Sequence, residues 1–208
     1  CPVGALNNKP YRYSARSWEM IQHETIAAHD CVGSNLYAHV LRGKVKRIVP
    51  RENEAINETW ISDRDRFSYE GIYSDDRLMS PMIKKDDKWQ EISWKDALIE
   101  VVEKLKVVDQ KSSAFLASPN STLEEFYLLT KLSNDLSINN VDHRLRVVDF
   151  TDQDNDPKIP LLGMNIAEIE ECKQIVVIGS DIRKEAPIIG HRIRKAALAG
   201  TQIGVINE

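Results

Sequence analysis

The first half of this chain is organised around two short stretches, residues 29–35 (HDCVGSN) and residues 60–64 (WISDR). The residues of the first stretch suit a loop that surrounds a metal cluster. A [4Fe-4S] cluster needs four thiolates, commonly three closely spaced and one from further along the chain. Only one cysteine, Cys31, lies between residues 27 and 62. The stretch therefore has the character of a cluster loop without the ligands of a cluster.

Composition limits the classes of protein. The chain has 208 residues, 42% hydrophobic and 29% charged, enough for one large or two small globular domains. No apolar run approaches the ~20 residues of a membrane span, and no signal peptide opens the chain. A net charge of −4 gives no basic surface for nucleic acid. Cys1, Cys31 and Cys172 are too few for a disulfide framework, so we expect a soluble protein in a reducing compartment, with no bound nucleic acid and no direct insertion into a membrane.

The chain begins with Cys1 and Pro2 and without an initiator methionine, so we expect residue 1 to lie inside a longer protein. A proline often follows the last cysteine of an iron–sulfur ligand run. The residues leave two interpretations of Cys1 open. It is either a ligand of a cluster whose other ligands lie upstream, or an ordinary cysteine.

The segment up to residue 82 reads as a small β-rich module. Alternating apolar residues predict its strands at 25–28, 35–41 and 44–49. Arg42 and Gly43 form the turn between the last two strands, and Pro50 ends the third. A polar loop follows, after which Trp60 and Ile61 are expected to return to the core.

From residue 83 the pattern changes to helices alternating with strands. Helix starts are expected at Ser93 with Asp96, and at Thr122 with Glu125 or Ser121 with Glu124. A third helix is expected from residues 179–181 through Ala199, ended by Gly200. Short apolar runs predict strands at 114–117, 174–178 and 201–206. Such alternation is typical of parallel βαβ units.

Two loops, residues 118–122 and 179–183, follow predicted parallel strands, where such sheets bind ligands. Neither matches the G-x-G-x-x-G or P-loop pattern, so the sequence gives no case for a bound nucleotide. Gly179 also fits an ordinary tight turn between a strand and a helix.

The histidines do not converge on a site. Only His29 and Cys31 have a plausible ligand spacing, and two ligands fall short of the four of a structural zinc site. No G-x-S-x-G elbow is present. Two charged runs, residues 183–185 and 192–195, fit a solvated helix face, with a rim for a partner or a phosphate as the alternative.

Several motifs in order resemble the G subunit of NADH-quinone oxidoreductase, respiratory complex I, which is related to the molybdopterin oxidoreductases. The resemblance covers essentially the whole chain. It is carried by residues 1–6 (CPVGAL), 32–35 (VGSN), 60–71 (WISDRDRFSYEG), 140–146 (NVDHRLR) and 179–187 (GSDIRKEAP).

This resemblance implies an α/β fold with a small antiparallel β-rich module of the 4Fe-4S Mo/W bis-MGD type, its cluster absent, followed by a parallel-sheet βαβ domain. It divides the chain into the tail of an upstream iron–sulfur domain with a connector (1–22), the β-rich module (23–82) and part of a molybdopterin-oxidoreductase-like domain (83–208). Cys1 then matches the fourth ligand of a [4Fe-4S] cluster whose other ligands lie upstream.

The family's cluster motif, close to C-x2-C-x3-C-x27-C, falls on positions that carry no cysteine here. They are Ala27, Asp30, Ser34 and Ser62. Alanine and serine cannot supply the soft thiolates that hold iron–sulfur clusters. Cys31 lies one residue out of register, and we expect it to be a small half-buried residue beside the loop.

The molybdenum ligand of related formate dehydrogenases follows a run that corresponds to residues 140–147 here. Its position falls on Val148, and a valine cannot bind molybdenum or tungsten. We therefore expect no molybdopterin, and no ligand at Gly179 and Ser180.

The resemblance implies a non-catalytic scaffold within a complex that passes electrons from NADH through iron–sulfur clusters to quinone, coupled to ion pumping. The partners would be other subunits of the peripheral arm, on the cytoplasmic side of the bacterial inner membrane. The alternative is a catalytic molybdopterin oxidoreductase such as a formate dehydrogenase, which would need the four cysteines and a metal ligand at position 148. A third possibility is an independent interaction module that shares the fold.

Overall fold

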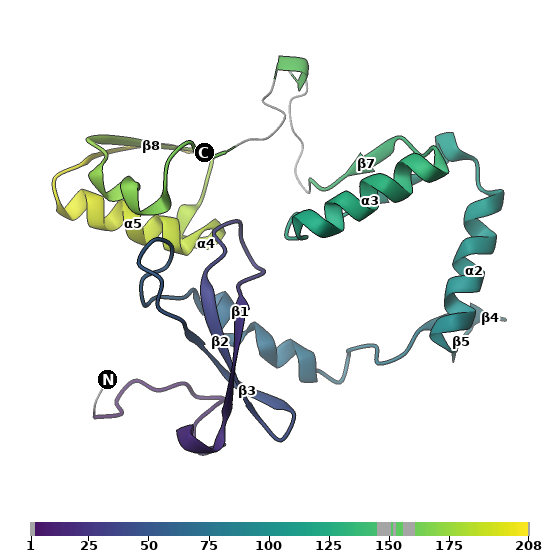
Figure 1. Cartoon of the computed structure of the whole chain (residues 1–208), viewed down its shortest axis with the longest axis horizontal. Helices are drawn as coiled ribbons and strands as arrows, with labels where there is room; N and C mark the ends of the chain where they lie inside the picture. The colour runs from purple at the N-terminus through teal and green to yellow at the C-terminus, as the bar shows by residue number, and fades with distance from the viewer. Residues whose placement is uncertain (1–2, 145–150, 152, 156–160, 208) are drawn as a thin grey trace. The chain divides into compact units, whose positions relative to one another are not determined.

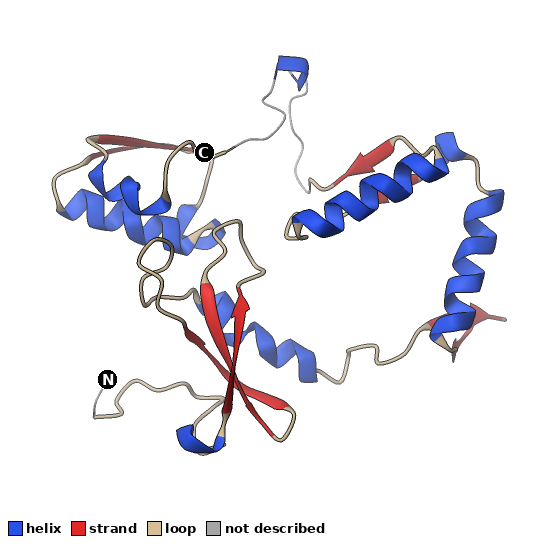
Figure 2. Cartoon of the chain, in the orientation of Figure 1, coloured by secondary structure: helices blue, strands red, loops and turns tan. Residues whose placement is uncertain are grey.

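The computed structural model describes residues 3–144, 151, 153–155 and 161–207. The predicted α/β class is confirmed: the described residues form two antiparallel sheets, of three and two strands, and two parallel strand pairs (Figures 1 and 2). The chain divides into two compact units, which are described separately. Unit 1 comprises residues 1–72 and 152–208, and unit 2 comprises residues 73–151. The domain boundaries expected from the sequence, at residues 22 and 82, stay a prediction.

Unit 1 begins with a three-stranded antiparallel sheet. Its strands are β1 (Ile21–Ile26), β2 (Asn35–Leu41) and β3 (Lys44–Pro50), in that order. The turn between β2 and β3 consists of Arg42 (φ 51°) and Gly43 (φ 75°), and two residues with positive φ suit a tight hairpin of twisted strands. The predicted strand at 25–28 is in fact longer and earlier, because the whole of β1 pairs with β2.

The core of this module lies between the sheet and the segment that follows it. Ala27, Leu36, Ile48 and Tyr69 form one buried cluster, and Ile61 packs against it. Tyr69 also donates a hydrogen bond from its hydroxyl to Lys46 O at 2.9 Å. The segment contains helix α1 (Asp63–Phe67) and the 3-10 helix η2 (Ser68–Tyr73); η1 (Ser17–Glu19) precedes β1.

The second part of unit 1 is a βαβ unit. Its elements are η5 (Ile166–Glu171), β8 (Gln174–Ile178), α4 (Ile182–Glu185), α5 (Pro187–Leu198) and β9 (Gln202–Ile206). Strands β8 and β9 pair in parallel. The single helix expected up to Ala199 is wrong. It breaks at Ala186 (φ −139°, ψ 74°), because the residue before a proline is driven out of the helical region.

Unit 2 contains a hairpin, a helix and a second βαβ unit. Its elements are β4 (Met82–Lys85), β5 (Lys88–Glu91), α2 (Trp94–Val107), η3 (Gln110–Ser112), β6 (Ala114–Leu116), α3 (Leu123–Leu136) and β7 (Asn140–Asp142). The predicted cap at Ser93 is confirmed, and Thr122 caps α3 in a capping box with Glu125. The hairpin and β7 were not expected from the sequence.

One short 3-10 helix, η4 (Gln153–Asn155), lies between the βαβ units in sequence. Within the described ranges, no helix is long and apolar enough to span a bilayer.

Candidate functional site

The loop that joins β1 to β2 contains three of the four positions expected to correspond to cluster ligands. Ala27 N donates to Ser34 O at 2.9 Å, which closes the base of the loop and holds two of these positions side by side. Gly33 has φ +71°, a conformation that side-chain-bearing residues rarely adopt. The loop is therefore a defined hairpin connection with both ends fixed to the sheet.

Asp30 is the third position and its side chain is only 3% exposed. Its Oδ1 accepts a hydrogen bond from Val32 N at 3.0 Å. Its Oδ2 is buried without a hydrogen-bond partner and lies 3.8 Å from Arg64 Nη2. Burial raises the pKa of Asp30, and the nearby charge of Asp65 adds to this, while Val32 N, Arg64 and His29 oppose it. A buried carboxyl group thus stands at a thiolate position.

Ser62, the fourth position, is the N-cap of α1. Its Oγ accepts from Asp65 N at 3.0 Å and donates to Asp65 Oδ2 at 2.7 Å. The other carboxylate oxygen, Asp65 Oδ1, accepts from His29 Nδ1 at 2.8 Å. Asp65 therefore connects Ser62 to the β1–β2 loop, so the structure brings together positions that are far apart in sequence.

The side chains at these four positions do not fit an iron–sulfur cluster. Ala27 offers a methyl group, the hydroxyl of Ser62 is engaged by Asp65, and Ser34 Oγ is buried without a hydrogen-bond partner. Iron–sulfur clusters are held by thiolates, and none of the four supplies one. Nor do the described residues contain a group of three His, Cys, Asp or Glu placed to hold a metal ion.

Cys31 is exposed, so the expectation of a half-buried residue is wrong. The loop turns inward on either side of it, at Asp30 and at Val32, which is 6% exposed. The one cysteine of the stretch therefore points to solvent and contributes nothing to the interior of the loop. Cys1 and Val148, the other two site residues expected from the sequence, lie outside the described residues.

Asn57 is a hub that the sequence did not reveal. It is 1% exposed, and its Oδ1 accepts from Asn35 N at 2.9 Å. Its Nδ2 faces several carbonyl groups, including Asn35 O at 3.3 Å and Trp60 O at 3.1 Å. An asparagine in a polar loop resembles a solvated residue, so no local signal distinguishes it.

A charge cluster joins the loop at residues 51–59 to α5 and η5. Arg192 is 3% exposed, and its Nη1 donates to Glu58 Oε1 at 2.9 Å and to Glu170. Lys195 also bonds Glu58, and its Nζ lies 2.8 Å from Glu170 Oε1. His191 Nε2 lies 3.2 Å from Glu58 Oε2. The solvated face expected for residues 192–195 is therefore wrong for Arg192, because Glu58, more than 100 residues earlier, packs against it.

The pKa values of this cluster move in the directions that ion pairing requires. A hydrogen bond from Lys195, helped by His191 and Arg192, holds the pKa of Glu58 below its ordinary value. Burial works in the opposite direction on Glu170, but the bonds from Arg192 and Lys195 outweigh it, and its pKa is lowered. Bonds to Glu170 and Glu58 raise the pKa of Lys195.

Trp60 does not enter the core, contrary to expectation. It is 55% exposed, and its ring lies 5.3 Å from the ring of His191, tilted by 45°. Ile61 alone packs on the core. Trp60 therefore belongs to the contact between the β-rich module and α5.

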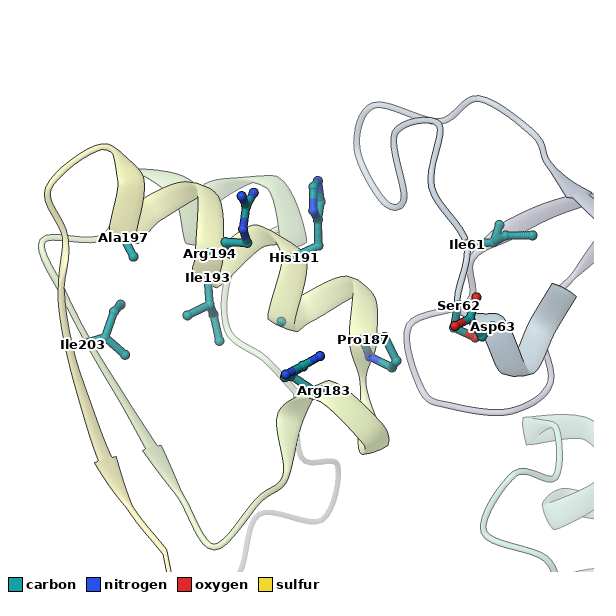
Figure 3. Close-up of a pocket in the computed structure, with 11 residues that line it drawn as sticks. Ile61, Ser62, Asp63, Arg183, Pro187, His191, Ile193, Arg194, Ala197 and Ile203 are labelled. Carbon is teal, nitrogen blue, oxygen red and sulfur yellow. The ribbon is translucent and has the colours of Figure 1, made fainter. Parts of the chain in front are cut away.

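A cleft of about 590 Å³ lies beside this contact (Figure 3). Arg183 and Arg194 stand at its edge and are exposed, while Ser62 and Asp63 lie opposite. Its walls are formed by residues around α1, α4, α5 and β9: Ile61, Ser62, Asp63, Arg183, Pro187, Gly190, His191, Ile193, Arg194, Ala197 and Ile203. Two exposed arginines on an open cleft make a rim of positive charge without a built anion site.

The loops after the parallel strands use their hydroxyl groups internally. Ser180 Oγ donates to Glu185 Oε2 at 2.7 Å, and Ser118 Oγ accepts from Asn120 N at 3.2 Å. Gly179 has φ +64°, as a tight turn requires. The two hydroxyl groups are thus engaged within the chain, and the expectation that no ligand binds at Gly179 and Ser180 stays a prediction.

Comparison with known families agrees with this architecture. The family model described as molybdopterin oxidoreductase matches residues 77–208. The model described as NADH-ubiquinone oxidoreductase NDSU1/NuoG-like, 4Fe-4S domain, matches residues 20–70. The chain belongs to the molybdopterin oxidoreductase family, whose model covers more than half of it.

Individual relatives show which proteins the chain is similar to over nearly its whole length. The chain is 38% identical to the G subunit of NADH-quinone oxidoreductase from Rickettsia felis, over 98% of this chain and 31% of that protein. It is 37% identical to the protein of the same name from Rickettsia typhi, over 99% of this chain and 30% of that protein. It is 33% identical to the NADH-ubiquinone oxidoreductase 75 kDa subunit of Reclinomonas americana, over 96% and 30%. The expected resemblance to the G subunit is confirmed, and the chain spans about 30% of the length of these curated relatives.

Proposed function

We propose that this chain is a non-catalytic scaffold within an NADH-quinone oxidoreductase subunit, and that it holds neither a cluster nor molybdopterin in its β-rich module. The complex would carry electrons from NADH through iron–sulfur clusters to quinone. This chain would contribute the folded β-rich module as a structural element, and it would supply Cys1 as the fourth ligand of an upstream [4Fe-4S] cluster. By itself, the chain would be inactive.

The observation that carries this proposal is the chemistry of the four residues at which the family's cluster motif has its cysteines. Ala27, Asp30, Ser34 and Ser62 supply no thiolate, and Ser62 Oγ is bound on both sides by Asp65. Iron–sulfur clusters are held by cysteine thiolates, with histidine as the known substitute in one class. The loop offers one imidazole, His29, whose Nδ1 bonds Asp65, and a single imidazole without thiolates falls short of the four ligands of a cluster.

Reconstitution of the 208-residue chain with iron and sulfide under anaerobic conditions tests the missing cluster. We expect neither the broad visible absorbance of a cluster nor an EPR signal after reduction. A stoichiometric signal of either kind would overturn the proposal.

The specific alternative is a catalytic molybdopterin oxidoreductase, for example a formate dehydrogenase. It requires a metal ligand at position 148, which is Val148 here. Metal analysis of the purified chain separates the two functions. Scaffold function predicts no molybdenum or tungsten above background, whereas either metal at one atom per chain would favour the catalytic alternative.

The role proposed for Cys1 is tested in the full-length subunit assembled in its complex. Replacement by alanine should remove one cluster signal from the EPR spectrum and impair assembly, because a cluster with three thiolates is incomplete. An unchanged spectrum would remove the assigned role. The partners proposed are the other subunits of the peripheral arm, on the cytoplasmic side of the membrane.

A further inference from the structure

Two segments that are distant in sequence meet at one buried carboxylate in unit 1. The side chain of Asp65, in α1, is 0% exposed, and its two oxygens bond different elements. Oδ1 accepts from His29 Nδ1 in the β1–β2 loop, and Oδ2 accepts from Ser62 Oγ at the start of α1. His29 and Asp65 are 36 positions apart, so this contact cross-links the loop to the helix.

A second, weaker link runs parallel to the first. Arg64 Nη2 lies 3.8 Å from Asp30 Oδ2 and donates to Glu185 O at 3.1 Å. Adjacent residues of the loop, His29 and Asp30, thus face adjacent residues of α1, Asp65 and Arg64. Four side chains from two segments form one polar junction.

From this geometry we infer that the His29–Asp65–Ser62 bridge replaces an iron–sulfur cluster as the cross-link between the loop and α1. The inference rests on the proposed function, because that proposal treats residues 27, 30, 34 and 62 as the former ligand positions of a cluster. A cluster held by three loop ligands and one ligand at residue 62 would tie the same two segments. Asp65 is then a positioning residue that fixes the loop through hydrogen bonds where relatives would use metal–sulfur bonds.

The chemistry of the bridge suits a structural link better than a catalytic one. A nucleophilic serine requires a base within hydrogen-bond reach, itself oriented by a third group. Here Ser62 bonds the carboxylate and not the imidazole, so His29 cannot take its proton. The carboxylate instead accepts from both neighbours, which is the arrangement that stabilises a buried charge.

The chain offers a matched control for the test. Ser93 and Asp96 repeat the Ser62–Asp65 pair at the start of α2, with Ser93 Oγ donating to Asp96 Oδ2 at 2.7 Å. Both residues of this second pair are exposed, and no histidine is bonded to Asp96 among the described residues. Asp65→Asn and Asp96→Asn therefore make the same chemical change with and without a cross-link.

Hydrogen exchange followed by mass spectrometry on the 208-residue chain measures the effect at the loop. Asp65→Asn should speed exchange of residues 27–34 by about 10- to 100-fold, because the amide has no charge and only one acceptor oxygen for the two donors, His29 Nδ1 and Ser62 Oγ. Asp96→Asn should leave that loop unchanged. Equal exchange in the wild-type and Asp65→Asn chains would overturn the inference, and so would an equal increase in both variants.

His29→Ala keeps the test decisive if Asp65→Asn unfolds. His29 is 33% exposed, so its removal should be tolerated, and it cuts the bridge while leaving the Ser62 cap in place. We expect faster exchange in residues 27–34, with a smaller increase in α1 because Asp65 Oδ1 loses its donor. Unchanged exchange of residues 27–34 would contradict the bridge. The His29 ¹⁵N shifts should also change in Asp65→Asn, and unaltered shifts would exclude the bond.

Iron content of the same samples separates this inference from the proposed function. Iron bound to the wild-type chain at cluster stoichiometry would overturn the scaffold proposal, whatever the exchange rates are. Absence of iron together with an unaffected loop in Asp65→Asn would leave the scaffold proposal standing and overturn the bridge alone.

Discussion

Helices α1 and α2 start with the same pair of residues in two different surroundings. Ser62 with Asp65, and Ser93 with Asp96, each combine a backbone N–H bonded to the serine with a 2.7 Å bond from the serine to the carboxylate. In α1 the pair is buried, and the carboxylate also accepts a hydrogen bond from His29. In α2 the pair is exposed, and among the described residues its carboxylate binds no histidine. A local sequence motif therefore sets the helix start, while the tertiary contact decides whether the start also anchors another segment.

The same difference extends to the rest of the two units. Unit 1 buries polar side chains and pairs them across long distances in sequence, as Asn57, Asp65 and Arg192 show. In unit 2, α2 has no buried residue and its ion pair between Lys104 and Glu100 is exposed. Charge changes should consequently matter much more in unit 1.

Arg192→Met is expected to have the largest effect. It leaves Lys195 as the one cation shared by Glu58 and Glu170, with His191 beside Glu58, and loss of one partner of a buried ion pair costs about 3–5 kcal/mol. Lys104→Met in α2 breaks an exposed pair and should cost less than about 0.5 kcal/mol. Urea unfolding, with hydrogen exchange to assign the loss to residues 51–59 and α5, measures both. Similar losses in the two variants would contradict the distinction between the units.

Ser62→Ala and Ser93→Ala compare the two caps directly. Loss of an N-cap costs about 1 kcal/mol, which is the expectation for Ser93. Ser62→Ala also leaves Asp65 Oδ2 buried without its donor, which adds about 1–3 kcal/mol. The local free energy of opening of α1 and α2, from hydrogen exchange, gives the two values. A loss in α1 no greater than that in α2 would show that burial adds nothing to the cap.

Acid should loosen residues 51–59 of unit 1. The pKa values of Glu58 and Glu170 are lowered from 4.5, so their contribution to stability is complete above that pH and is lost as the pH falls through the lowered values. The pKa of Lys195 is raised from 10.5, so its contribution is lost only above that pH. Hydrogen exchange of residues 51–59 from pH 5 downward checks the acid limb. In Arg192→Met this limb should be flatter, and an identical limb would remove the cluster as its cause.

Asp30→Asn should have the smallest effect on stability, and unlike the other substitutions it should stabilise the chain. Burial raises the pKa of Asp30, so the wild-type chain loses stability as the pH rises through that value. The uncharged asparagine removes this loss and should raise the urea midpoint slightly at pH 7, with no gain at pH 3. A lower midpoint at pH 7 would show that the contact of Asp30 with Arg64 outweighs the burial of its charge.

Sequence patterns within a few residues predicted the strands and helix caps that depend only on those residues. Strand β2 was expected at its observed bounds because its residues alternate, and β8 because its apolar run is continuous. The Ser93 and Thr122 caps were also expected, since a cap needs only residues within one turn. The hairpin β4–β5 was missed, although Asp86 and Asp87 adopt positive φ at its turn, because its strands alternate poorly and β5 is fully exposed.

The candidate site was less predictable, because its contacts join segments that local patterns treat separately. Alignment with the family's cluster motif identified Ala27, Asp30, Ser34 and Ser62 as the positions of the cluster ligands. It gave no indication that Asp65 ties Ser62 to His29, or that Arg192 is buried against Glu58. Charged residues on a helix usually face water, so only the tertiary structure identifies a buried exception.

Counting iron in two reconstituted chains tests the absence of a cluster at this loop. The wild-type chain is compared with a variant in which Ala27, Asp30, Ser34 and Ser62 are all replaced by cysteine. The account predicts no stoichiometric iron in the wild type and about four iron atoms per chain in the variant, whose thiolates restore the ligand set. About four iron atoms in the wild-type chain would contradict it.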